Sequence, residues 1–182
     1  MKLLPYRELD AGRNWAAVGT WPCRWIAVPA LATPPFLAAY RLRFTLPAAA
    51  TLRLHVSADE RYALYCDGAR LGRGPERGDL SRWHYETYEL PLAAGTHCLV
   101  AKVWSLGALA PMAQVSARHG FLLGGEGPFQ EQLSTGVAPW EGMRVSGCEF
   151  LPATLLWGAG ARVRLDGAAW PWGVEEIGRA HV

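Results

Sequence analysis

A β-hairpin pattern in the first half of the chain restricts the possible folds more than any other feature. Residues 57–75 read SADERYALYCDGARLGRGP, and apolar and polar positions alternate up to Asp67-Gly68. Asp-Gly between two such runs is among the strongest signals for a two-residue turn joining antiparallel strands. Gly72 and Gly74 in the second run permit the backbone to approach its neighbours closely before the strand ends at Pro75. We therefore predict a hairpin, one face of which carries Tyr62, Leu64 and Cys66.

Similar alternation recurs at residues 40–46, 51–57 and 162–165 and predicts strands there. Aromatic and apolar runs predict further strands at 83–90 and 96–104, and shorter ones are expected at 25–28, 120–124, 132–135 and 143–146. Such strands follow one another about every eight to twelve residues, with turn residues between them and without a sustained helical period. This pattern is typical of an all-β protein, and we expect an antiparallel β-sandwich of the jelly-roll or galactose-binding-like type.

The length suits one domain, or one domain with the start of another, because the chain has 182 residues. Prolines interrupt residues 1–24, which we expect to be irregular. The sandwich is expected to span residues 25–150. Residues 151–182 are expected to form a linker or the start of a truncated following domain.

Charge and hydropathy argue against several classes of partner. The net charge is only +2, from 18 basic and 16 acidic side chains, so nothing demands nucleic acid or an anionic membrane. The sequence has no apolar run long enough for a signal peptide or a membrane span, which makes the cytoplasm the default location. The densest basic set is explained more simply by a solvated loop face than by phosphate binding. It consists of Arg70, Arg73, Arg77 and Arg82.

The cysteines and histidines do not suggest a metal or another cofactor. The four cysteines include no C-x-x-C pair, and the histidines show no H-E-x-x-H spacing. Cys66 and Cys98 fall inside predicted strands, where a free cysteine behaves as a small apolar residue. We therefore expect no metal site and no cofactor.

Catalytic residues are not evident either. Glycoside hydrolysis usually needs two carboxylates on either side of the scissile bond. Glu86 and Glu89 are three apart on a predicted strand and so point to opposite faces. Asp59-Glu60 lies at a turn and is most simply solvated. Because a G-x-S-x-G motif is also missing, we assign no catalytic residue.

The best candidate for ligand binding follows the hairpin. This segment combines charge, a hydrogen-bonding ring and flat aromatic faces, the groups that sugar sites use. The candidate sugar-binding residues are Arg73, Asp79, Trp83, His84 and Tyr85. Packing against the sandwich edge or a neighbouring domain is an alternative role for Trp83 and Tyr85. The chain contains nine tryptophans, and tryptophan side chains both fill protein cores and stack on sugar rings.

Five segments follow one another in a characteristic order, namely RYALYCDG at residues 61–68, LGRGP at 71–75, HYETY at 84–88, AKVW at 101–104 and GFLLGGE at 120–126. In this order they resemble the N-terminal β-sandwich of bacterial α-L-rhamnosidases, which belong to glycoside hydrolase family 78 and the related six-hairpin glycosidases. The resemblance covers about residues 25–146.

The resemblance implies a parent enzyme that hydrolyses terminal α-L-rhamnosides with inversion. Its acid and base carboxylates would belong to an (α/α)6 barrel downstream, which a chain of this length does not include, so no catalytic residue is carried over. Some family members also have a rhamnose-binding sandwich with calcium, whose ligands have no match here. We therefore expect a non-catalytic domain whose partners are the downstream barrel and a carbohydrate. Two alternatives remain open, namely an autonomous carbohydrate-binding module and a structural sandwich of another glycosidase, such as a β-galactosidase-like enzyme.

Overall fold

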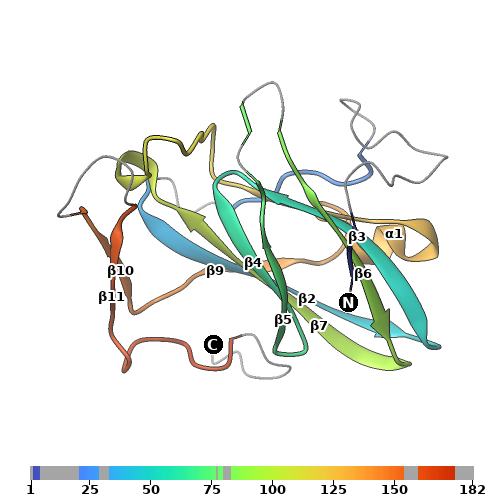
Figure 1. The fold of residues 1–182 in the computed structure, drawn as a ribbon. Helices are drawn as coiled ribbons and strands as arrows, with labels where there is room; N and C mark the ends of the chain where they lie inside the picture. The colour runs from blue at the N-terminus through green and yellow to red at the C-terminus, as the bar shows by residue number, and fades with distance from the viewer. Residues whose placement is uncertain are drawn as a thin grey trace.

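Two facing antiparallel sheets and a separate hairpin make up the fold (Figure 1). The computed structural model describes residues 2–4, 21–28, 33–76, 78–79, 83–153 and 160–174. The strands are β1 (Lys2–Leu4), β2 (Phe36–Leu46), β3 (Ala50–Ala58), β4 (Arg61–Cys66), β5 (Ala69–Gly74), β6 (Glu86–Leu92), β7 (Gly95–Ser105), β8 (Phe121–Gly125), β9 (Glu141–Arg144), β10 (Cys148–Leu151) and β11 (Arg162–Leu165). The helical elements are the short 3-10 turns η1 (Gly107–Leu109) and η2 (Gly127–Phe129) and the helix α1 (Gln130–Leu133).

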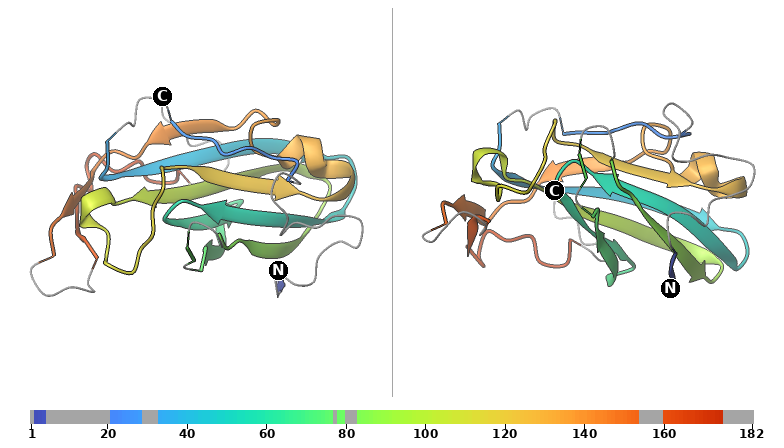
Figure 2. Two further views of the ribbon diagram at one scale, coloured as in Figure 1. Left: turned by 90° about the horizontal axis from the view of Figure 1, so that it is seen from above. Right: turned by 45° about the horizontal axis from the view of Figure 1, so that its top comes forward.

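The larger sheet has the order β5-β4-β7-β2-β9 and the smaller one the order β1-β6-β3-β8. The strands β10 and β11 pair only with each other among the described residues. They lie at one end of the molecule, and α1 lies at the other (Figures 1 and 2). The predicted all-β antiparallel sandwich is confirmed. No helix in the described ranges is long and apolar enough to cross a membrane.

The predicted hairpin is confirmed in its position and its turn. Strands β4 and β5 pair from Tyr62↔Gly74 to Cys66↔Ala69. Both turn residues have positive φ, 50° at Asp67 and 81° at Gly68, as a type I′ turn requires. This turn matches the right-handed twist of the two strands, so a local sequence signal was sufficient here.

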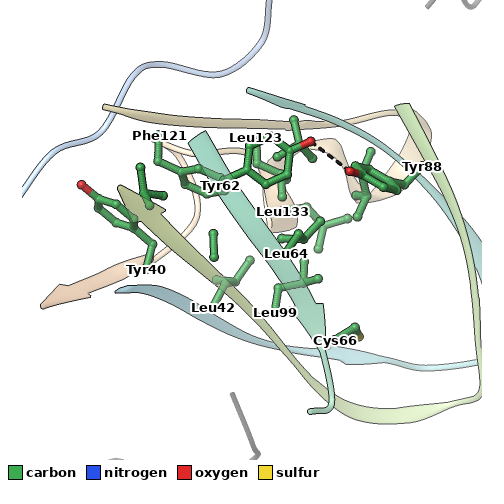
Figure 3. Packing of buried hydrophobic residues seen from close by; sticks show 14 of the residues in the cluster. Tyr40, Leu42, Tyr62, Leu64, Cys66, Tyr88, Leu99, Phe121, Leu123 and Leu133 are labelled. Atoms are coloured by element: carbon green, nitrogen blue, oxygen red, sulfur yellow. Dashed lines mark hydrogen bonds between the residues drawn. The ribbon is translucent and has the colours of Figure 1, made fainter. Parts of the chain in front are cut away.

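The core lies between the inward faces of the two sheets, where alternation predicted it. The strand β2 contributes Tyr40, Leu42, Phe44 and Leu46, all of them buried. The hairpin contributes Tyr62, Leu64 and Cys66. Figure 3 shows the hydroxyl of Tyr62 pointing across the core to that of Tyr88, and their oxygens lie 3.0 Å apart. The buried hydroxyls therefore satisfy each other within an otherwise apolar layer.

The prediction of a strand at residues 132–135 is wrong, because this segment contains the end of α1. Leu133 is buried in the core, and the two residues after it use their side chains to cover the edge of β8. The backbone N–H of Gly125 donates to the hydroxyl of Ser134 at 3.3 Å, and that of Leu123 to Thr135 at 3.2 Å. Ser134 and Thr135 thus accept hydrogen bonds along the edge of β8, as a neighbouring strand would, although they do not form a strand themselves.

Other predicted strands differ in extent. The strand expected from residue 40 begins at Phe36, as β2, and the strand expected from residue 83 begins at Glu86, as β6. The segment 25–28 forms a single bridge, Ile26↔Phe121, instead of a strand. This bridge matters for the site described below, because it brings the segment that contains Trp25 and Ile26 to the start of β8.

Glu60 is buried, so the expectation of a solvated Asp59-Glu60 pair is wrong for this residue. Its side chain accepts the backbone N–H of Leu106 at 2.8 and 2.9 Å and that of Gly107 at 3.1 Å. Burial raises the pKa of the Glu60 carboxyl, while the two backbone donors act in the opposite direction. The carboxylate thus ties the β3–β4 turn to the segment that follows β7.

Candidate functional site

A cleft of about 470 Å³ opens beside the β3–β4 turn, where the Ile26↔Phe121 bridge brings distant segments together. The residues that line it are Trp25, Ile26, Ala27, Asp59, Trp83, Ala117, Arg118, His119 and Gly120. Of these, only Trp83 belongs to the set predicted from the sequence.

Two tryptophans form the aromatic part of the cleft. The rings of Trp25 and Trp83 lie edge to face, with their centroids 6.2 Å apart. Trp83 is held by a hydrogen bond from its Nε1 to the carbonyl oxygen of Ala58 at 3.3 Å, whereas Trp25 remains 48% exposed. Gly120 permits this arrangement, since a Cβ there would lie 2.9 Å from the Trp25 ring. The cleft therefore offers an accessible, fixed aromatic surface to a ligand.

Asp59 builds one wall of the cleft and is 4% exposed, so the expectation that it is solvated is also wrong. Its Oδ1 accepts the backbone N–H of Ala117 at 2.8 Å and that of Arg118 at 2.9 Å, and its Oδ2 accepts the hydroxyl of Ser116. The carboxylate thus fixes residues 116–118 against the β3–β4 turn. It already accepts three hydrogen bonds and serves the structure of the loop.

His119 is half-buried beside the cleft. Its Nε2 lies 2.8 Å from the hydroxyl of Tyr40, which itself accepts a hydrogen bond from the backbone of Val28. Tyr40 can therefore donate its proton to Nε2, and in that arrangement the neutral ring carries its own proton on Nδ1. Burial lowers the pKa of His119, which favours this neutral form. Nδ1 has no hydrogen-bond partner in the part of the chain that the structure describes.

The other predicted residues do not join Trp83 in this cleft. His84 lines a small adjacent recess with Glu76, and its carbonyl oxygen accepts the hydroxyl of Ser57 at 2.8 Å. Tyr85 is 9% exposed and packs edge to face against Trp21, with the ring centroids 4.9 Å apart. This contact corresponds to the alternative role of Tyr85 in packing. Arg73 and Asp79 are exposed, and Arg73 lines a different groove.

Sequence reasoning missed Trp25, Asp59, Arg118 and His119. These residues are up to 94 positions apart, between Trp25 and His119, and no local spacing links them. The only available signal was the unusual number of tryptophans, which does not say which of them face solvent.

One group of residues has the composition of a metal site. Ligand atoms of Cys66, Asp67 and His97 lie within 4.8 Å of one another at the hairpin turn. Hydrogen bonds account for this cluster. Nδ1 of His97 lies 2.7 Å from Asp67 Oδ2, Nε2 of His97 lies 3.0 Å from the carbonyl oxygen of Ala93, and Asp67 Oδ1 accepts the Cys98 N–H at 2.8 Å. Burial raises the pKa of the Cys66 thiol to about 12, which disfavours the thiolate that a metal needs.

These contacts predict that His97 makes stability depend on pH. Both ring nitrogens face acceptors, so the folded state favours the imidazolium, and the bond to Asp67 raises the pKa of His97 above 6.5. The stabilisation is therefore complete below about pH 6.5 and is lost as the pH rises through the higher pKa of the folded state. We expect the difference in Tm between the wild type and His97→Gln to be largest near about pH 6 and to shrink by about pH 9. A difference that stays constant or grows over this range in thermal melts would contradict the assignment.

The comparisons with known proteins give matches among solved structures alone. No protein-family model and no curated protein sequence matches the chain. A family 78 rhamnosidase from Bacillus sp. GL1 matches with a TM-score of 0.72 and 20% identity, over 87% of this chain and 17% of that one. An α-L-rhamnosidase from Aspergillus terreus matches with a TM-score of 0.53 and 13% identity, over 80% of this chain and 18% of that one.

A lectin from Pleurotus ostreatus has a similar fold as well, with a TM-score of 0.51 and 17% identity over 89% of this chain and 46% of the lectin. The chain spans less than a fifth of either rhamnosidase. At these identities the comparisons establish the fold, and they agree with the family resemblance seen in the sequence. The chain has the fold of an α-L-rhamnosidase-like β-sandwich domain.

Proposed function

We propose that this chain is a non-catalytic β-sandwich of an α-L-rhamnosidase-like glycoside hydrolase, which supports an (α/α)6 catalytic barrel and contacts sugar through the Trp25–Trp83 cleft. The observation that carries the proposal is this cleft, in which an exposed ring and a fixed ring meet beside polar side chains. The likeness to two rhamnosidases supports the choice of enzyme class.

The carboxylates near the cleft support a non-catalytic role. A general acid or base needs an oxygen that can reach the substrate and exchange a proton with it. Asp59 and Glu60 are 4% and 2% exposed, and both accept backbone N–H groups. We therefore expect that removing either side chain changes the conformation of the loops around the cleft and does not remove a group that takes part in a reaction.

Sugar contact is supported by the chemistry of the lining. A pyranose ring presents apolar C–H groups on one face, which stack on indole, while its hydroxyls need a few fixed polar partners. Trp25 provides an exposed indole, and Arg118 and His119 lie on the same cleft as polar groups. The small size of the cleft favours a terminal sugar over a long chain.

The test is a titration of tryptophan fluorescence with L-rhamnose and an aryl α-L-rhamnoside. We expect quenching that saturates in the wild type, disappears in Trp83→Ala and Trp25→Ala, and persists in Trp172→Ala. Trp172 is a matched control because it is 70% exposed and lies outside the lining of the cleft. The same samples should release no aryl alcohol from the rhamnoside.

A flat titration at millimolar sugar would contradict the proposed contact, and turnover that an active-site inhibitor titrates would contradict the non-catalytic role. An autonomous carbohydrate-binding module is the second candidate, and the likeness to a lectin favours it. Equally strong quenching by several unrelated sugars, lost in the same two variants, would support that candidate instead.

A further inference from the structure

The outer face of the five-stranded sheet collects most of the basic side chains of its strands. Residues opposite each other on neighbouring strands project from the same face of a sheet. The register places Arg73, Ala63 and Lys102 in one row and Arg70, Tyr65, Val100 and Arg41 in the next, while Arg61 lies opposite Trp104. This face is opposite to the core, since Tyr62 and Leu64 between these positions point inward.

A β-bulge brings two arginines of β5 together on this face. In a regular strand, residues three apart point to opposite sides. The register of β4 and β5 shifts between Leu64 and Tyr65, so that Tyr65 pairs with Arg70 whereas Leu64 pairs with Gly72. The additional residue at the bulge lets Arg70 and Arg73 project from the same side. Both line one groove.

This groove has a volume of about 910 Å³ and lies between the β4–β5 hairpin and the separate β10–β11 hairpin. Two half-buried rings, Tyr65 and Trp104, belong to its lining together with Arg61, Arg70 and Arg73. In Figure 1 the β10–β11 hairpin lies to the left of β4 and β5. The lining of the groove includes residues of both hairpins, which pair in different sheets.

The positive charge in the groove is only partly compensated. Arg41, further along the face, forms an ion pair with Glu141, and Lys102 lies over the rings of Tyr65 and Trp170 at 5.4 and 5.1 Å. Arg70 and Arg73 form no ion pair with any other described residue. The acidic residues of the lining are Glu76 and Glu86, and Glu86 accepts the backbone N–H of Glu76 at 3.2 Å.

We propose that this groove binds an anionic glycan strand, with a uronate carboxylate held by Arg70 and Arg73 and sugar rings packed against Tyr65 and Trp104. Guanidinium groups bind carboxylates through paired N–H···O bonds, and aromatic rings that line a groove bind the apolar faces of pyranoses. A glycan fits better than nucleic acid, because the positive charge is confined to one groove and the net charge of the chain is only +2. The site is separate from the Trp25–Trp83 cleft, shares no lining residue with it and goes beyond the proposed function.

The experiment is calorimetric titration of the full chain with an oligogalacturonate, with a neutral malto-oligosaccharide of equal length as the reference ligand. We expect binding of the oligogalacturonate at about 50 mM salt, weaker binding at higher salt, and none of the neutral ligand. Arg70→Ala and Arg73→Ala should each weaken binding by about tenfold or more, because each removes a charge-assisted contact. Arg144→Ala is the matched control, since this exposed arginine lies on the edge strand β9 and should leave the affinity unchanged.

Further variants separate this site from the cleft and from a general attraction of anions. Trp83→Ala should retain oligogalacturonate binding, so a failure of the cleft proposal would not affect this one. Tyr65→Ala, with an unchanged melting profile, should weaken binding as well. Absence of binding at low salt, unchanged affinity in the Arg70→Ala/Arg73→Ala double variant, or equally tight binding of a single-stranded oligonucleotide would each overturn the proposal.

Discussion

Replacing Asp59 by alanine is expected to lower the free energy of unfolding by about 3 kcal/mol and to abolish sugar-dependent quenching at the cleft. The carboxylate is 4% exposed and accepts two backbone N–H groups and one hydroxyl from residues 116–118. Hydrogen bonds to a charged partner contribute about 1.5–3 kcal/mol each. Ala117 and Arg118 are exposed, so water can replace part of what their N–H groups lose, which keeps the expected total well below the sum.

Asp59→Asn is the matched control for this prediction. An asparagine keeps a carbonyl oxygen for the N–H groups of Ala117 and Arg118, and its amide can donate to the hydroxyl oxygen of Ser116. We expect it to lose about 1 kcal/mol and to retain the quenching. Urea denaturation followed by circular dichroism measures both variants. If Asp59→Ala unfolds at the same urea concentration as the wild type, the carboxylate does not organise the loop.

The difference between expectation and structure at Asp59 and Glu60 has a simple physical cause. Two adjacent carboxylates at a turn are usually solvated, and the sequence around them contains no partner. Their donors lie at residues 106–107 and 116–118, about fifty positions downstream, and the pairing of β4 with β7 places that part of the chain beside the turn. A single sequence carries no signal for such contacts.

The strands, in contrast, could be predicted well because their signals are local. Alternation along β2 and β4 identified the inward residues, and Asp67-Gly68 identified the turn. The candidate site was less predictable. Trp83 belongs to the cleft, but Arg73 and Tyr85 were grouped with it by sequence proximity alone, and the strand geometry separates them. The projection of Arg70 and Arg73 from the same side of β5 depends on a β-bulge, and the sequence contains no local signal that predicts this bulge.

Replacing Gly72 by alanine is expected to lower the free energy of unfolding by about 3 kcal/mol, the upper end of the usual cost of overpacking. A Cβ at this position would lie 2.5 Å from Cε1 and from the hydroxyl oxygen of Tyr88. The ring cannot move aside easily, because Tyr88 is 1% exposed and hydrogen-bonded to Tyr62 at 3.0 Å. The smaller unfolded-state entropy of alanine offsets less than about 1 kcal/mol of this cost. The glycine in the sequence pattern indicated that another group lies close to the backbone here, and in the structure this group is the ring of Tyr88.

Two controls separate a steric clash from a general effect of removing glycine. Gly167→Ala should change stability by less than about 0.5 kcal/mol, because its Cβ would meet only the Trp172 ring at 3.9 Å, an ordinary contact distance. Combining Gly72→Ala with Tyr88→Leu should cost clearly less than the sum of the two single changes, since the smaller side chain leaves room for the new methyl group. Urea midpoints of the four proteins provide this coupling energy. Strict additivity would show that the Tyr88 ring does not limit the space at Gly72, and the packing of β5 against the core would then need another explanation.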